Sequence, residues 1–199
     1  MEKSLFENSI RNYQPQFLSE TPHAAAILVI CMEDEAKNLF LILTKRSSTL
    51  VTYAGDYSFP GGMRDENDLD FKATAQREVK EELNIDAEQY EIIGNLNDFL
   101  DRYGNLVKPF VAVINKKMFE EHYQKSLDEV ESIYYFPLEE LKKLDTNLDL
   151  EHITKRHPSY YYQNQDVMIW GLTASIMVHL SNIIFGLHRP IGTLLTDNN

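Results

Sequence analysis

The sequence predicts an α/β (α+β) fold, an α/β/α sandwich with a mixed central β-sheet, forming one domain over residues 1–199 with its core at about 24–187. Several short apolar segments are bounded by Gly, Pro, Asn and Asp, as strands are. A polar helical pattern follows in the middle of the chain, and an apolar one lies near its end. Strands mixed with a few helices favour a sheet covered by helices, and no repeat or linker divides the chain.

The strands are expected in the following order. Residues 24–32 and 38–46 are apolar and flank a polar turn, which predicts a β-hairpin of buried strands. Residues 50–70 are rich in Gly, Pro, Asp and Asn, so we expect a long loop with a short extended piece at 57–62. Further strands are expected at 90–96, 99–114 with a turn at 103–105, 130–137, and a later pair at 150–156 and 159–170.

Three helices are expected. The first spans 71–83, with Asp70 as N-cap and Asn84 in the left-handed conformation at its end. Its buried stripe is Ala75, Val79 and Leu83, which recur every four residues. A short helix is expected at 137–144, where proline occupies the first turn. The apolar stripe of the C-terminal helix comprises Leu172, Ile176, Leu180, Ile183, Ile184 and Leu187.

Composition narrows the functional classes. The net charge of −12 disfavours nucleic acid and anionic membranes as partners, because both would repel this surface. The single cysteine, Cys31, excludes an intrachain disulfide and is expected to be a buried structural thiol. We find no secretory signal, and polar residues interrupt the longest apolar stretch, so we expect a cytoplasmic protein without a membrane span. The sequence leaves a homodimer open.

Three glutamates in the segment REVKEELNI indicate the chemistry. Glu78, Glu81 and Glu82 project from one flank of the 71–83 helix, where like charges repel by about 0.2–0.5 kcal/mol per pair. One explanation is a solvated polar helix face. The other is half of a coordination shell for Mg²⁺ or Mn²⁺, since these hard cations prefer oxygen ligands and also bind substrate phosphates.

Residues 62–85 resemble the Nudix box, which reads glycine, five residues, glutamate, seven residues, then R-E-apolar-x-E-E-x-G-apolar. Three positions depart from it: Asp68 replaces the first glutamate, eight residues separate it from Arg77, and Asn84 replaces the last glycine. The first two departures are familiar in the coenzyme A pyrophosphatase branch of the family.

A second signature of that branch precedes the box. Its matching residues are Leu43, Thr44, Arg46, Ser47, Gly55 and the FPGG run at 59–62, whereas Val51, Tyr53 and Asp56 depart from it. Residues 169–177 are similar to the segment that opens the last helix in this branch, and residues 128–130 are similar to one of its loop motifs.

The resemblance implies a role for each of these groups. Glu78 and Glu82 would be the main metal ligands, Glu81 a third ligand or the group that orients water, and a backbone carbonyl near Gly61 would complete the set. Arg77 would lock the glutamates by pairing with Asp68, which is the supporting residue. Gly61 and Gly62 would let the backbone approach metal and phosphate.

Other roles have competing explanations. The general base would be Glu81, or Glu129 or Glu131 from a loop, although both loop residues fit simple exposure. Lys45 and Arg46 would meet the 3′-phosphate of coenzyme A, or be plain surface charges. Tyr53 and the tyrosines at 160–162 would stack an adenine ring, with packing as the alternative.

The function implied by the resemblance is metal-dependent hydrolysis of the diphosphate bond of coenzyme A or acyl-CoA. The alternative is another nucleoside diphosphate derivative, such as ADP-ribose or NADH, which the missing arginine at Val51 favours. An inactive binding module on the same fold is the third hypothesis.

Overall fold

The computed structural model describes residues 1–19, 21, 23–49, 53–146 and 160–191. Within these ranges an eight-stranded mixed sheet has the order β3-β2-β1-β7-β5, and β4, β6 and β8 pair with β1, β7 and β2 respectively. Its strands are β1 Ala24–Glu33, β2 Leu39–Arg46, β3 Tyr57–Ser58, β4 Gly61–Met63, β5 Glu91–Asn95, β6 Phe99–Leu100, β7 Leu106–Asn115 and β8 Val130–Pro137.

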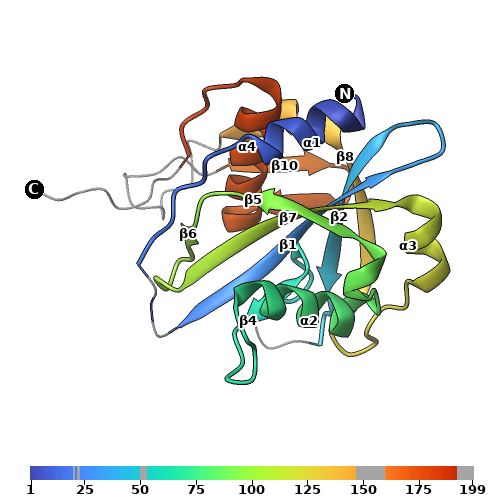
Figure 1. Cartoon of the computed structure of the whole chain (residues 1–199), viewed down its shortest axis with the longest axis vertical. Coiled ribbons are helices and arrows are strands. Elements are labelled where there is room, and N and C mark those ends of the chain that lie inside the picture. The colour runs from blue at the N-terminus through green and yellow to red at the C-terminus, as the bar shows by residue number, and fades with distance from the viewer. Residues whose placement is uncertain (20, 22, 50–52, 147–159, 192–199) are drawn as a thin grey trace, which may run out of the picture.

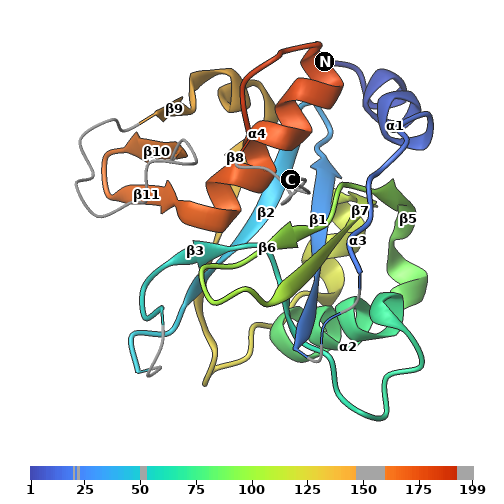
Figure 2. The same ribbon diagram turned by 90° about the vertical axis from the view of Figure 1, so that its left-hand side faces the viewer.

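Helices cover both faces of this sheet, as predicted (Figure 1). Helices α1 and α4 pack on one face, and α2 and α3 pack on the other. A second, three-stranded sheet lies beside α4 (Figure 2). The bounds are α1 Lys3–Arg11, α2 Phe71–Leu83, α3 Lys116–His122, α4 Gly171–Phe185, the 3₁₀ helices η1 Ala87–Gln89 and η2 Leu138–Lys143, and the strands β9 Asp145–Thr146, β10 Tyr160–Asn164 and β11 Val167–Trp170.

Strand β1 is the centre of the sheet. It runs parallel to β7 along its full length and antiparallel to β2 at residues 31–33, so the predicted hairpin is present. Its residues alternate between the two cores, with Val29 and Cys31 facing α1 and α4, and Leu28 and Ile30 facing α2. Burial on both faces explains why the strand is apolar throughout. The thiol of Cys31 is buried, as predicted, and burial raises its pKa.

The first half of β1 pairs with β4 instead of β2. Ile27 lies opposite Gly61, and Ala26 lies opposite Gly62. Gly61 has a φ of 152°, and a Cβ at this position would lie 2.4 Å from the carbonyl oxygen of Ala26. Only glycine therefore fits here, and this close approach places both glycines against α2.

Helix α2 has the predicted bounds and caps. The carboxylate of Asp70 accepts a hydrogen bond from the Ala73 N–H, and Asn84 closes the helix at φ 58° and ψ 27°. Ala75, Val79 and Leu83 are fully buried, as predicted. Because this stripe fixes the rotation of the helix on the sheet, it also fixes where the glutamates lie.

The C-terminal helix differs in detail from the prediction. Helix α4 ends at Phe185 because Gly186 takes the left-handed conformation, so Leu187, which was predicted to belong to the apolar stripe of this helix, lies beyond its end. The helix packs against α1, β10, β11 and η2, and its buried side chains include His179 and Ser181. No helix among the described residues is long and apolar enough to cross a membrane.

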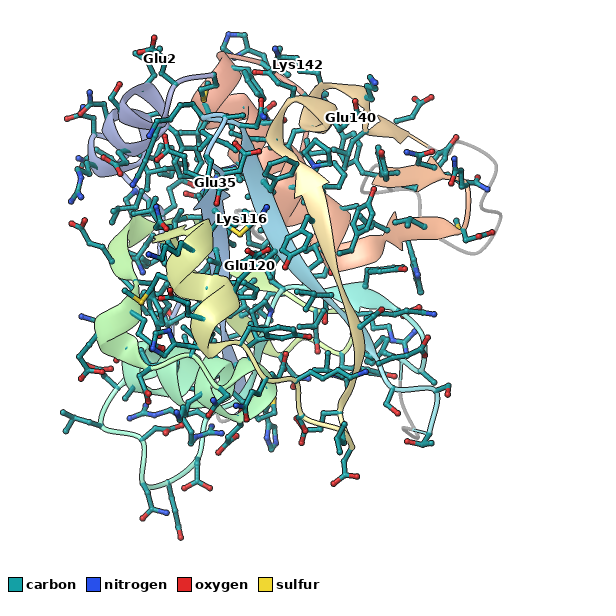
Figure 3. All side chains as sticks on the ribbon, turned by 90° about the vertical axis from the view of Figure 1, so that its right-hand side faces the viewer. Glu2, Glu35, Lys116, Glu120, Glu140 and Lys142 are labelled. Atoms are coloured by element: carbon teal, nitrogen blue, oxygen red, sulfur yellow. The ribbon has the colours of Figure 1, made fainter. Side chains whose placement is uncertain are left out.

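Two helices were not predicted. In α1 only Phe6 and Ile10 are buried, which gives a weak periodic signal, yet both belong to the core and extend it beyond the predicted start at residue 24. Helix α3 is two turns long; its Lys116 lies between Glu35 and Glu120, as Figure 3 shows.

The short helix expected at 137–144 is present as the 3₁₀ helix η2. One other element was mispredicted. Residues 159–170 contain the β10–β11 hairpin, not one strand of a pair, and residues 150–156 lie outside the described residues.

Candidate active site

Glu82 lies at the centre of the site. Its side chain is buried, and its Oε1 accepts a hydrogen bond from the Gly61 N–H at 3.3 Å. The second oxygen, Oε2, is buried without a hydrogen-bond partner. Burial raises the pKa of Glu82 to about 8; the Gly61 N–H and the charge of Arg46 oppose the rise, and the charges of Glu78 and Glu129 add to it. A buried carboxylate oxygen without a partner is costly unless something else binds it.

Glu78 lies against the backbone of Gly62. A Cβ at position 62 would come within 2.5 Å of Oε1 of Glu78, so the carboxylate fills the space that a side chain would take. The Glu78 side chain is 13% exposed, and burial raises its pKa against the lowering effect of Arg77. The two glycines of β4 therefore bring backbone into contact with two carboxylates of α2.

Arg77 organises the acidic side chains. Its Nε and Nη2 donate to the two carboxylate oxygens of Asp68 at 3.0 Å each, so the predicted pair is present. This pairing lowers the pKa of Asp68 to about 2. Nη1 of Arg77 donates to Glu78 at 2.8 Å and to Glu81 at 2.9 Å. One guanidinium thus neutralises much of the repulsion among the glutamates.

The arrangement fits a divalent cation, although it is not a ready-made metal cluster. Among the described residues, no group of three His, Cys, Asp or Glu side chains is placed to hold a metal ion, because Arg77 engages Glu78 and Glu81. The buried free oxygen of Glu82 and the carboxylate seated at Gly62 offer the hard oxygen donors that Mg²⁺ and Mn²⁺ prefer. Glu81, half exposed, can turn toward such an ion.

Of the two loop candidates for general base, Glu129 lies in the loop between α3 and β8, whereas Glu131 lies in strand β8 and not in a loop as expected. The backbone of the loop is fixed to the end of α2, since the Ser126 N–H donates to the carbonyl of Glu82 at 2.9 Å. The charge of Glu129 adds to the raised pKa of both Glu78 and Glu82. The carboxylate of Glu131 instead pairs with Lys45 at 2.7 Å. Glu131 is thus engaged by a lysine whereas no ion pair engages Glu129 among the described residues, and the identity of the general base stays a prediction.

Lys45 and Arg46, the two basic candidates at the end of β2, also differ in whether a carboxylate pairs with them. Lys45 is held by Glu131, whereas the charge of Arg46 acts on Glu82, and Nε of Arg46 is buried without a partner. The backbone of Arg46 pairs with the following loop through Gly55 and Asp56. Val51, the departure from the branch signature, lies outside the described residues.

The tyrosines proposed to stack a base separate into two groups. Tyr160 and Tyr162 are buried in the core, and Tyr161 is partly buried on the small sheet, so packing accounts for these three. Tyr53 is 38% exposed. It contacts Arg102, which the sequence analysis did not single out because no motif connects two positions so far apart.

Comparisons with known proteins agree with this geometry. Residues 21–157 match the NUDIX domain family. The chain is 32% identical over 176 residues to Nudix hydrolase 15, mitochondrial, of Arabidopsis thaliana, covering 85% of this chain but only 60% of that protein. It is 35% identical over 171 residues to an uncharacterized Nudix hydrolase, NudL, of Photorhabdus laumondii, covering 84% of this chain and 88% of that protein.

The fold has a counterpart among solved structures. A MutT/nudix family protein from Enterococcus faecalis superposes with a TM-score of 0.55 at 17% identity, over 88% of this chain and 66% of that one. From the family match over residues 21–157 and the two relatives above 30% identity, we conclude that this chain belongs to the Nudix hydrolase family.

Proposed function

We propose that this protein hydrolyses the diphosphate bond of coenzyme A or an acyl-CoA, releasing 3′,5′-ADP (adenosine 3′,5′-bisphosphate) and the corresponding 4′-phosphopantetheine. The observation that carries the hydrolytic part is the buried, unpartnered oxygen of Glu82 beside Gly61. An isolated buried carboxylate would destabilise the fold without benefit, so we infer that it serves a cation. The match of Arg46 and residues 59–62 to the upstream signature supports the coenzyme A part.

Nudix hydrolases generally need divalent ions such as Mg²⁺ or Mn²⁺. In this chain Glu78 and Glu82, with Glu81 and the carbonyl of Gly61, would hold the ion. When bound, such an ion polarises phosphoryl oxygens, neutralises developing charge and lowers the pKa of its bound water. Arg77 would keep the helix carboxylates in place through its pair with Asp68.

The remaining steps belong to side chains at the rim. A carboxylate must accept the proton of the attacking water, and Glu129 or Glu81 would do so. Arg46 carries the positive charge that faces Glu82, so it would pair with a phosphate of the bound substrate. Lys45 is already neutralised by Glu131, and we assign it a weaker part.

A second candidate keeps the chemistry and changes the ligand. Val51 stands where the coenzyme A branch usually has arginine, which favours another nucleoside diphosphate derivative such as ADP-ribose or NADH. An inactive binding module is the third candidate. It is disfavoured because a module without catalysis has no need for three neighbouring glutamates, one of them buried.

The test is a product assay. Purified protein with Mg²⁺ or Mn²⁺ is offered coenzyme A, ADP-ribose and NADH separately, and products are identified by mass. Release of 3′,5′-ADP from coenzyme A at the highest kcat/KM is the expected result. A higher kcat/KM on another substrate would transfer the function to the second candidate. No turnover on a wider panel would favour the binding module.

A further inference from the structure

Tyr53, Arg102 and Tyr103 form a small exposed cluster. The guanidinium carbon of Arg102 lies 4.6 Å from the ring centre of Tyr53 and 4.8 Å from that of Tyr103. Arg102 also donates to the Tyr103 hydroxyl at 2.7 Å. The two tyrosine side chains come from different loops, the one before β3 and the β6–β7 turn, which Figure 2 shows on the same side of the molecule.

In the described ranges no carboxylate pairs with Arg102. The adjacent carboxylate of Asp101 is used by its own turn, where it accepts from the backbone of Tyr103 and from Asn105. Because the Tyr103 hydroxyl uses only one of its N–H groups, the Arg102 guanidinium has donors left to bind an anion.

Tyr53 is held in a conformation that bulky residues rarely adopt. Its φ is 57°, in the left-handed region, and its side chain remains 38% exposed. The loop is anchored at Asp56, whose backbone carbonyl accepts from Arg46 and whose carboxylate accepts from Trp170 at 3.3 Å. Strain in an anchored loop that presents an aromatic ring to solvent is a feature of ligand sites.

The same loop connects the cluster to the glutamates. Gly55 and Asp56 pair with the backbone of Arg46, whose charge acts on the buried Glu82. Tyr53 therefore precedes by two and three residues the positions, Gly55 and Asp56, that are hydrogen-bonded to the end of β2. If the diphosphate of a nucleotide binds near Arg46, its ribose and base lie within reach of the loop that carries Tyr53.

We propose that Tyr53, Arg102 and Tyr103 form a subsite for the nucleotide end of the substrate. A tyrosine ring stacks on the purine, and the guanidinium of Arg102 pairs with a phosphate carried by the ribose. Aromatic rings stack on any base, and arginine matches phosphate with two parallel hydrogen bonds. The subsite rests on the proposed function for its choice of ligand, a nucleoside with a ribose phosphate, but its existence is tested by binding alone.

The experiment compares two nucleotides by titration calorimetry in EDTA, so that no turnover occurs. The probes are 3′,5′-ADP and AMP, which differ by the phosphate on the ribose 3′ oxygen. We expect the wild type to bind 3′,5′-ADP about tenfold more tightly, since hydrogen bonds to charged groups contribute that much or more. Arg102→Ala should lose this preference while still binding AMP.

Two further variants separate stacking from charge. Tyr103→Ala should weaken the binding of both nucleotides by a similar factor of about ten. Tyr103→Phe, which keeps the ring, should leave their binding unchanged. Arg11→Ala is the charge-matched control, because Arg11 is exposed on α1 and pairs with Glu91. It should retain the full preference. An unchanged preference in Arg102→Ala, or no preference in the wild type, would overturn the subsite.

The outcome is independent of the proposed function. If the wild type hydrolyses coenzyme A and Arg102→Ala has the same kcat/KM on coenzyme A and 3′-dephospho-coenzyme A as the wild type, the subsite is wrong and the function stands. If the wild type does not hydrolyse coenzyme A, but binds 3′,5′-ADP more tightly than AMP and the Arg102→Ala variant does not, the subsite stands and the substrate assignment is wrong.

Discussion

At the scale of single residues, the site combines one neutralised acidic pair with one isolated acid. Arg77 binds Glu78 and Glu81, which relieves most of the repulsion expected from their spacing. Glu82 is left without a cationic partner in hydrogen-bonding contact and keeps one buried oxygen free. The sequence predicted that all three carboxylates project from one flank of the helix, and the structure gives them different exposures and partners.

Removing the carboxylate of Glu82 should abolish most activity. In Glu82→Gln we expect kcat to fall about a hundredfold or more, because an electrostatic group at the reacting phosphate is lost. The fold should be retained, since the amide keeps the volume of the side chain. The assay is steady-state hydrolysis with Mg²⁺, and Glu66→Gln, at an exposed glutamate, is the control. Near-normal turnover in Glu82→Gln would contradict the metal assignment.

The two glycines of β4 should respond differently to alanine. In Gly62→Ala the new Cβ meets the flexible end of Glu78, so the carboxylate shifts and kcat falls about tenfold or more, while the melting temperature changes little. In Gly61→Ala it meets the backbone of Ala26 and Ile27 at a φ of 152°, so the protein should be strongly destabilised. Thermal melts and kcat on both variants check this, and equal effects at the two positions would disprove it.

At the scale of elements, the sequence predicted those features that depend on residues close together in the chain. The bounds and caps of α2 follow from Asp70, Asn84 and the apolar stripe, all of which act within one helix. The pair of Arg77 with Asp68 was predicted through the family resemblance. Contacts between distant segments, such as Arg102 with Tyr53 or Ser126 with Glu82, have no signal in one sequence because the tertiary fold creates them.

The N-cap of α2 gives a prediction at this scale. Asp70→Ala removes the acceptor of the Ala73 N–H, which lies 2.8 Å from the carboxylate oxygen. We expect the free energy of unfolding to fall by about 1 kcal/mol. Because the glutamates lie at the opposite end of the helix, kcat should remain near that of the wild type. Urea denaturation measures the first quantity, and Asp70→Asn, which also caps helices, should restore it.

At the scale of the whole molecule, His179 connects α4 to the opposite edge of the main sheet. Its Nε2 lies 3.3 Å from the backbone N–H of Asn97, which donates to it, and 3.3 Å from the hydroxyl of Tyr13. Burial lowers the pKa of His179 to about 4. The neutral imidazole therefore holds together the N-terminal segment, the sheet edge and the last helix.

This histidine should make stability depend on pH. Its folded pKa lies below the unfolded value of about 6.5, so its contribution is present above pH 6.5 and is lost as pH falls toward 4. We expect His179→Gln, whose side-chain oxygen can accept the same hydrogen bond, to lose less stability over this window. Melting temperatures at pH 4.5 and 7 for both proteins measure the difference, with His188→Gln as the exposed control. Parallel pH profiles for His179→Gln and the wild type would refute this role.

Because the net charge is −12, a bound cation should affect both the activity and the stability of the whole molecule. The glutamates of α2 repel the diphosphate of the substrate unless a cation lies between them, so activity should disappear in excess EDTA and return with Mg²⁺ or Mn²⁺. Binding to the folded state alone should also raise the melting temperature by roughly 5–10 °C at about 100 times Kd. Since the pKa of Glu82 is about 8, protons compete with the ion, and the increase should be larger at pH 8.5 than at pH 6.5. Glu82→Gln should lose most of this increase. If the melting temperature of the wild type does not change when Mg²⁺ is added, the buried carboxylate does not bind this metal ion.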